Sequence, residues 1–313
     1  PIRPSRSASP RCSRRPERKT AKDMRTLVVA TDFSSGAELA VERAARIARN
    51  RGAALWLLHV FDDGVWASMR SLYDIERWVG ADPVVSAREY LSRQAVGLSS
   101  RFGVTVRAET VHGSAPQAIA AFAKAQRADL LAMGVSSDDW LRYAMLGGSA
   151  QRVVEHADVP VLLVRRPAQT DFSHALVATD FSEGAMRAAQ LALAFMAEAR
   201  LTLLHTHVVE FEGRMRLAGA TNEDIERYRA QERQRAAGRM EVFLAALGEE
   251  ARRFEPCFEH GHAAAAILKK ASEIGPDLIV IGKHGGSAFE ERLLGSVTQN
   301  ILYSAACDVL LSP

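Results

Sequence analysis

Short apolar runs alternate with longer segments of mixed polarity along most of the chain. Residues 27–30, 54–60 and 175–178 are typical of the short runs, and residues 37–48 place alanines and other apolar side chains at helical spacing. Short, nearly continuous apolar runs indicate strands that are buried on both faces. Strands that alternate with helices pair in parallel through right-handed crossovers. The pattern therefore predicts an α/β fold.

The pattern occurs twice, at a constant offset. Residues 28–34 read Val-Val-Ala-Thr-Asp-Phe-Ser, and 148 positions later residues 176–182 read Leu-Val-Ala-Thr-Asp-Phe-Ser. At the same offset Gly113, Asp129, Gly134, Gly147 and Gln151 recur as Gly261, Asp277, Gly282, Gly295 and Gln299. This period is far longer than the roughly 20–50 residues of a solenoid repeat. We therefore predict a tandem duplication, with a doubly wound, five-stranded parallel sheet flanked by helices in each copy.

The expected organisation has four parts. Residues 1–23 form a disordered basic tail, residues 24–164 the first domain, residues 165–173 a linker and residues 174–313 the second domain. The predicted strands of the first copy are 27–30, 54–60, one ending near Val111, 129–133 and 159–164. Those of the second are 175–178, 201–208, one ending near Glu259, 277–281 and 309–311. Helices are expected at 37–48, 116–125, 263–273 and 297–302, with helix N-caps at Ser34 or Ser35 and at Ser182.

The longest predicted helical region is residues 214–247. It is rich in Arg, Glu, Ala and Gln, which indicates a solvated face. Its apolar stripe is expected to consist of Ile225, Tyr228, Met240, Phe243 and Leu247.

Composition and charge narrow the class of protein. Apolar content of 48% and charged content of 25% are typical of globular proteins, and no apolar run approaches the roughly 20 residues of a membrane span. The net charge is +3, but residues 1–23 carry eight basic and two acidic side chains, so the remainder is net −3. We therefore expect neither a nucleic-acid surface nor membrane association. Three cysteines without a paired motif favour the reducing cytoplasm, and Cys307 is expected to be a buried apolar residue.

A glycine-containing loop in the second copy is the main candidate for chemistry. Gly282-Lys283-His284-Gly285 follows a predicted strand, and Gly295-Ser296 precedes a predicted helix nine residues later. Ligands of open α/β sheets lie beyond the carboxyl ends of strands, and a helix N-terminus attracts anions. Glycines permit close backbone approach and positive φ, so that successive amides form an anion nest. The loop therefore predicts a phosphate site, although glycines also occur in turns for steric reasons alone.

These residues, over positions 24–313, resemble the universal stress proteins in their tandem two-domain form. The resemblance is carried by Ala-Thr-Asp-Phe-Ser after the first strand, Leu-Leu-His at the end of the second, and the Gly-x2-Gly-x9-Gly-Ser loop. It implies Rossmann-like domains, adenine-nucleotide binding where the glycine motif is intact, and a stress-responsive role. The nucleotide-binding residues that it implies are Thr179, Asp180, Thr206 (through its backbone), Gly282, Gly285, Gly295, Ser296 and Val297. From their place inside the loop we expect Lys283 and His284 to bind the nucleotide as well.

Asp180 needs a physical account, because a carboxylate repels phosphates. We expect a Mg²⁺ bridge or a ribose hydroxyl at this carboxylate; the alternative is that Asp180 caps the following helix. ATP is the expected ligand, with ADP or AMP as alternatives.

The first copy departs from the motif. Ser137 stands where Gly285 stands, Gly148 replaces Ser296, and Asp138 with Asp139 adds negative charge. Like charges near a multivalent phosphate lower affinity. We expect a degenerate site there, weak or empty, although Gly147 and Ser149 retain part of the pattern.

Histidines offer a second kind of site. His205, His207, His260 and His262 all lie near strand ends of the second copy, and converging imidazoles would suit zinc. The alternative is that they never meet, and His205 has a counterpart in His59, which favours a structural role.

No catalytic motif is present in the sequence, so we expect a binding protein in which the nucleotide is a regulatory ligand read by an unknown protein partner. The alternatives are a slow ATPase or autokinase, with Lys283 and His284 at the γ-phosphate and Ser296 or Ser287 modified, and a nucleotide-free interaction module. The resemblance implies that the duplicated halves pack about a pseudo-twofold axis through their closing strands, and further dimerisation stays open.

Overall fold

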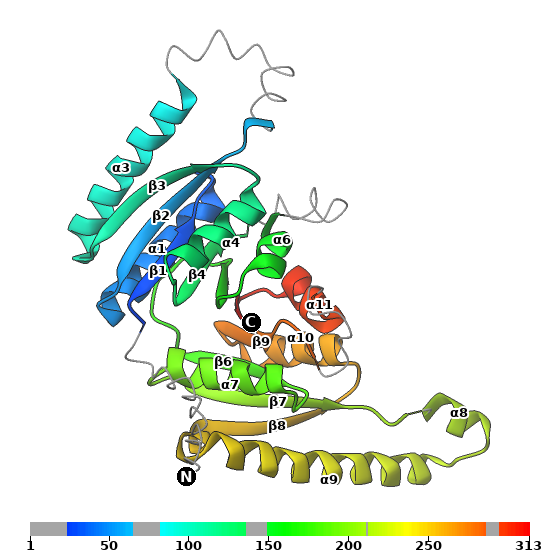
Figure 1. The fold of residues 1–313 in the computed structure, drawn as a ribbon. Coiled ribbons are helices and arrows are strands. Elements are labelled where there is room, and N and C mark those ends of the chain that lie inside the picture. Colours follow the sequence, from blue (N-terminus) through cyan, green and yellow to red (C-terminus); the bar gives the residue numbers. More distant parts are fainter. Residues whose placement is uncertain (1–23, 65–81, 136–148, 211, 286–293) are drawn as a thin grey trace, which may run out of the picture.

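The computed structural model describes residues 24–64, 82–135, 149–210, 212–285 and 294–313. Its strands form one ten-stranded sheet in the order β3-β2-β1-β4-β5-β10-β9-β6-β7-β8 (Figure 1). The first half contributes β1 (Thr26–Ala30), β2 (Ala54–Phe61), β3 (Val106–His112), β4 (Leu130–Gly134) and β5 (Val161–Val164). The second half contributes β6 (His174–Thr179), β7 (Arg200–His207), β8 (Phe254–His260), β9 (Leu278–Gly282) and β10 (Asp308–Ser312). Each predicted strand is present.

Strands are parallel within each half, and the halves join in antiparallel fashion. β5 pairs with β10, with Leu162 opposite Leu310. Every residue of both strands is buried, so neither could remain an exposed sheet edge. This pairing confirms that the copies meet through their closing strands.

Helices cover both faces of the sheet. One face carries α1 (Ser35–Arg51), α3 (Pro83–Phe102), α7 (Glu183–Phe195) and α9 (Asn222–Leu247), which share one apolar core. The other carries α4 (Ala115–Ala125), α6 (Ser149–His156), α10 (Ala263–Ile274) and α11 (Ser296–Ser304) over a second core, which includes Cys307. The doubly wound α/β prediction is confirmed. No helix within the described ranges is long and apolar enough to cross a membrane.

The helix that follows the first strand of each copy begins as predicted. Ser34 and Ser182 accept hydrogen bonds from the backbone amides of Ala37 and Ala185, so each serine caps its helix. Ser35 is instead the first residue of α1.

The region predicted as one helix over 214–247 is two helices. A short α8 (Glu212–Leu217) precedes α9, and a capping box between Thr221 and Asp224 starts the second helix anew. Four of the five predicted stripe residues are buried, whereas Tyr228 is 45% exposed. The helices α8 and α9 form an arm that projects beyond the sheet (Figure 1).

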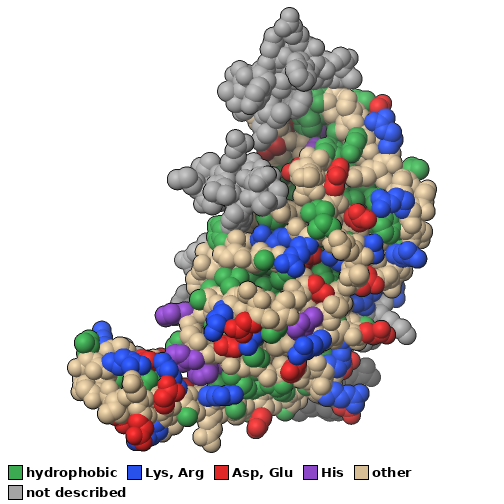
Figure 2. Space-filling view, turned by 180° about the vertical axis from the view of Figure 1, so that it is seen from behind, with side chains coloured by type: hydrophobic (Ala, Val, Ile, Leu, Met, Phe, Trp, Pro, Cys, Tyr) green, Lys and Arg blue, Asp and Glu red, His purple; other side chains and the backbone are tan. Residues whose placement is uncertain are grey.

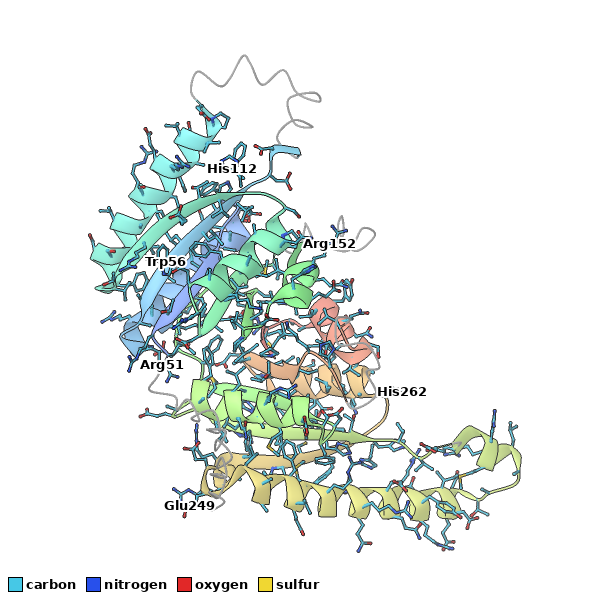
Figure 3. The ribbon with its side chains drawn as sticks, viewed as in Figure 1. Arg51, Trp56, His112, Arg152, Glu249 and His262 are labelled. Carbon is cyan, nitrogen blue, oxygen red and sulfur yellow. The ribbon has the colours of Figure 1, made fainter. Side chains whose placement is uncertain are left out.

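The segment between the halves is held by a buried ion pair. Arg43 of α1 lies 3.4 Å from the carboxylate of Asp308, which also accepts hydrogen bonds from the amides of Arg165 and Arg166. Burial raises the pKa of Asp308, and the Arg43 charge opposes that rise. Arg51, at the end of α1 (Figure 3), adds a hydrogen bond to the carbonyl of Phe195 in the second half.

Candidate functional site

A cavity of about 180 Å³ opens at the carboxyl ends of β6 and β9. The sheet of the second half reverses its strand order between these two strands, which is where open α/β folds bind ligands. Side chains and backbone from β6, β7, α7, α10, β9 and α11 line the cavity. Nine of the ten predicted nucleotide-binding residues are among them: Thr179, Asp180, Thr206, Gly282, His284, Gly285, Gly295, Ser296 and Val297.

The tenth residue, Lys283, points elsewhere. Its side chain is 5% exposed, and its ammonium group donates to the carbonyl of Ala157 in the first half. The structure therefore does not bring Lys283 to the cavity, because the alternating direction of side chains at a strand end turns it away from its neighbours.

The Thr-Asp-Phe-Ser segment contributes Thr179 and Asp180 to the cavity wall. Phe181 has a φ of 67°, and its amide donates to the hydroxyl of Thr179 at 3.0 Å. The Nδ1 of His205 donates to the carbonyl of Thr179 at 2.8 Å, and its ring lies 4.2 Å from the ring of Phe181. Burial lowers the pKa of His205, because the charged imidazolium loses its hydration there.

The first half repeats this arrangement. Phe33 has a φ of 65°, and His59 bonds through Nδ1 to the carbonyl of Thr31 at 2.9 Å. A geometry shared by both copies serves the fold, which supports the structural interpretation of His205.

Asp180 faces the glycine loop. Its Oδ1 accepts from the amide of Ser182, and the capping of α7 is made by the Ser182 hydroxyl. A Cβ atom placed on Gly285 would lie 2.8 Å from the Asp180 Oδ2. Glycine at position 285 therefore allows the carboxylate to lie against the loop backbone.

Gly282 has a different reason to be glycine. A Cβ there would lie 3.1 Å from the backbone of Gly184, at the start of α7. The first half has the same close approach between Gly134 and Gly36. None of Gly282, Gly285 and Gly295 has a positive φ, so the expectation of a positive-φ nest is wrong and close approach is the operative property.

The N-terminus of α11 closes the cavity. Its N-cap is Gly295, which provides no side-chain cap, and Ser296, Val297 and Thr298 of the first turn line the cavity. The hydroxyl of Thr298 donates to the carbonyl of Gly282, which fixes the helix against the end of β9. A helix N-terminus without a side-chain cap favours an anion or a hydroxyl oxygen.

Apolar residues complete the lining, and none of them was predicted as a site residue. They are Ala178, Ala185, Leu204, Ala263, Ile267 and Ile281. They follow the same periodicity as core residues, so no sequence signal separated them from the core.

The four histidines predicted as zinc ligands do not assemble. The described residues contain no group of three or more His, Cys, Asp or Glu side chains able to hold a metal ion. The rings of His207 and His260 lie 5.7 Å apart, and His262 stands at the start of α10 (Figure 3). Figure 2 shows histidines gathered at the base of the α8–α9 arm without forming one compact group.

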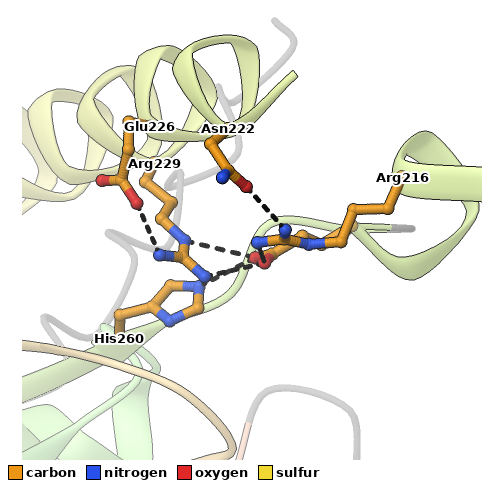
Figure 4. Close-up of polar contacts among 6 residues, drawn as sticks. Arg216, Asn222, Glu226, Arg229 and His260 are labelled. Carbon is orange, nitrogen blue, oxygen red and sulfur yellow. Dashed lines mark hydrogen bonds and ion pairs between the residues drawn. The ribbon is translucent and has the colours of Figure 1, made fainter. Parts of the chain in front are cut away.

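His260 instead belongs to a charged cluster with α8 and α9 (Figure 4). Its Nε2 lies 3.6 Å from Glu212, which also receives hydrogen bonds from Arg216 and Arg229. These guanidinium groups hold the pKa of Glu212 below its usual value. A metal ion beside His260 would have to compete with two guanidinium groups for this carboxylate.

Several predictions fall on residues outside the described ranges. They concern Ser137, Asp138, Asp139, Gly147 and Gly148 of the first copy, and Ser287 of the second.

The fold and the cavity define a class: a tandem α/β protein with a ligand crevice at the strand-order reversal of its second half. The model of the universal stress protein family matches residues 24–165 and again residues 171–313. The chain belongs to the universal stress protein family, in a tandem two-domain form.

Individual relatives agree with this assignment. Universal stress protein MJ0531 of Methanocaldococcus jannaschii is 27% identical over 150 residues, covering 45% of this chain and 82% of the relative. YxiE of Bacillus subtilis is 29% identical over 145 residues, covering 45% of this chain and 98% of the relative. A universal stress protein structure from Archaeoglobus fulgidus shares the fold over 93% of this chain and 98% of its own, with a TM-score of 0.65 and 17% identity.

Proposed function

We propose that the second half of this universal stress protein binds an adenine nucleotide, ATP with ADP or AMP as alternatives, as a regulatory ligand of a stress response. The observation that carries the proposal is a single cavity that joins an apolar floor to the uncapped N-terminus of α11. An adenine base requires the first feature and phosphates require the second.

The base occupies the end of the cavity between β7 and α10. Leu204 and Ile267 provide apolar surface there, and Thr206 follows at the end of β7, where its backbone meets the edge of the base.

The phosphates lie at the other end. The amides at the start of α11, the Ser296 hydroxyl and the backbone at Gly285 supply donors, and His284 lies beside them. Lys283 is excluded from this role, because its ammonium group is directed into the first half.

Asp180 takes either the ribose hydroxyls or a Mg²⁺ ion. Its carboxylate lines the cavity against the loop, and hard oxygen donors of this kind suit Mg²⁺, which usually binds one or two carboxylates together with substrate phosphates. When bound, the ion would offset the repulsion between the carboxylate and the phosphates.

The nucleotide test uses purified protein without added nucleotide. Denaturation followed by anion-exchange chromatography should release close to one adenine nucleotide per chain, and calorimetric titration of the emptied protein with Mg·ATP should give one site. Two nucleotides per chain would show that the first half also binds. If no nucleotide is released and the titration gives no signal, the result would favour the alternative of a nucleotide-free interaction module.

A matched pair of variants locates the site. Gly285→Ala displaces the Asp180 carboxylate, and we expect about tenfold weaker binding, the scale of one charged hydrogen bond. Gly238→Ala places the same methyl group on α9 with nothing within 4 Å and should bind as the wild type does. Equal nucleotide affinities in the two variants would contradict the proposed location of the binding site. Repeating the wild-type titration with ATP in EDTA tests whether binding requires Mg²⁺.

A further inference from the structure

The side chain of Lys283 crosses from the nucleotide loop into the other half of the molecule. It comes from the position between Gly282 and His284, and its ammonium group donates to the carbonyl of Ala157. Ala157 follows the last residue of α6 and is 2% exposed. A cation at the carboxyl end of a helix is favourable, because the last carbonyls carry partial negative charge.

The backbone of Lys283 is tied to the walls of the cavity. Its amide donates to Ser312 at the end of β10, and its carbonyl accepts from the amide of Gly295 at 3.0 Å. Gly295 is the N-cap of α11. The position of Lys283 therefore sets the distance between the Gly282–Gly285 turn and the helix that receives phosphates.

A second contact joins α11 to α6. The hydroxyl of Tyr303 in α11 donates to Gln151 of α6 at 2.9 Å, and Gln151 in turn bonds Glu155. Tyr303 thus docks α11 on the first half, and Lys283 docks the loop itself.

The duplication shows that the fold does not require this lysine. At the offset of 148 residues, Lys283 corresponds to Val135, and Ala157 corresponds to Ala305. The Val135 amide repeats the backbone bond, to Val164, but its side chain is apolar. The lysine is present in the copy that has the intact glycine motif.

Keeping a lysine here opposes stability. Burial lowers the pKa of Lys283 to about 8, and the carboxylates of Asp158 and Glu155 offset part of that effect. Asp158 is shared, because it also pairs with Lys124 of α4 at 2.7 Å. A group that is costly to bury, and that the sister copy replaces with valine, points to a function in the loop.

We infer that Lys283 is a positioning residue for the nucleotide site, and that the first half supplies its anchor at the end of α6. The inference rests on the proposed nucleotide binding. It gives the degenerate copy a role: the first half holds the glycine loop of the second half in its binding geometry. The protonated amine makes a charge-assisted bond to Ala157, and loss of the proton weakens that bond.

The experiment measures ADP affinity by calorimetry across pH 7.5–9.5 with the full chain. Phosphate groups have their second pKa near 6, so the ligand does not titrate in this range. The wild type should bind about fivefold more weakly at pH 9.5 than at pH 7.5, with a midpoint near the pKa of Lys283. Lys283→Met, which retains the length of the side chain, should bind about fivefold more weakly at pH 7.5 and show no such pH dependence.

Two further variants make the test specific. Asp158→Asn removes a carboxylate that raises the pKa of Lys283, so it should move the midpoint to lower pH without touching the loop. Tyr303→Phe removes the hydrogen bond between α11 and Gln151 of α6 and should retain the wild-type profile. Thermal melts of each variant establish that it is folded.

The outcomes separate two failures. If the wild type does not bind ADP at pH 7.5, the proposed function is wrong. If the wild type binds, but Lys283→Met has the same affinity and the same pH profile, nucleotide binding stands and the role of Lys283 is overturned. An unmoved midpoint in Asp158→Asn would also count against the anchor in the first half.

Discussion

Replacing Lys283 with methionine should make the protein more stable near neutral pH. The ammonium group is buried at the junction of the two halves, and its pKa falls from 10.5 in the unfolded chain to about 8 in the folded one. A difference of this size corresponds to about 3 kcal/mol against the folded state when the lysine is charged. The hydrogen bond to Ala157 stabilises the folded state by about 1 kcal/mol. We therefore expect Lys283→Met to gain about 2 kcal/mol at pH 7.

The sign of the pH dependence follows from proton binding. Between the folded and unfolded pKa values the unfolded chain binds more protons, so wild-type stability rises with pH in that window. The contribution of Lys283 should improve by about 1 kcal/mol between pH 7 and pH 9. The difference in free energy of unfolding between Lys283→Met and the wild type should decrease by the same amount. Cys307, whose pKa is raised to about 11 by burial, acts in the opposite direction at higher pH but is common to both proteins.

Urea denaturation followed by circular dichroism measures this difference at pH 7, 8 and 9. Tyr303→Phe is the control, because it removes one hydrogen bond at the same junction and leaves Lys283 in place. A destabilised Lys283→Met at pH 7, with equal slopes m, would refute the burial argument. So would a difference from the wild type that stays constant from pH 7 to pH 9.

The remaining predictions concern stability. Gly134→Ala should lower the free energy of unfolding by about 3 kcal/mol or more, because its Cβ would lie 2.1 Å from the Gly36 carbonyl. Gly282→Ala, whose Cβ contacts are at 3.1 Å, should lower it less. Equal midpoints of the two variants in urea would contradict this order. Arg43→Met should lower the free energy of unfolding by about 3 kcal/mol, because it leaves the Asp308 carboxylate buried without the Arg43 cation. The double variant Arg43→Met with Asp308→Asn should recover part of this stability in the same assay. Thr221→Ala should cost about 1 kcal/mol and speed hydrogen exchange in the first turn of α9; unchanged exchange there would show that the capping box is unimportant.

Much of the fold could be predicted because it depends on local pattern. Alternating apolar runs and helical segments identified every strand, and the constant offset predicted two matching halves. The serine caps followed from short-range hydrogen-bonding chemistry. The break between α8 and α9 was missed because the charged composition continues across it, and only the capping box at Thr221 marks the new helix.

The site was predicted in outline because the glycine motif and the strand ends are sequence features. Nine of the ten proposed residues line one cavity. The reason for each glycine was not predictable, because Gly285 meets Asp180 and Gly282 meets Gly184 only after distant segments pack. The zinc prediction failed because strand-end position alone does not determine which side chains converge.

The sequence by itself determined the duplication, the strand and helix pattern, and the location of the candidate site, since all three are encoded in nearby residues and their repetition. The tertiary structure decided where Lys283 goes. Sequence proximity placed it beside the phosphates, but the antiparallel pairing of β5 with β10 brings α6 against the loop and offers the lysine a helix-end carbonyl. Only the packing of the two halves creates that partner, so no local pattern could reveal it.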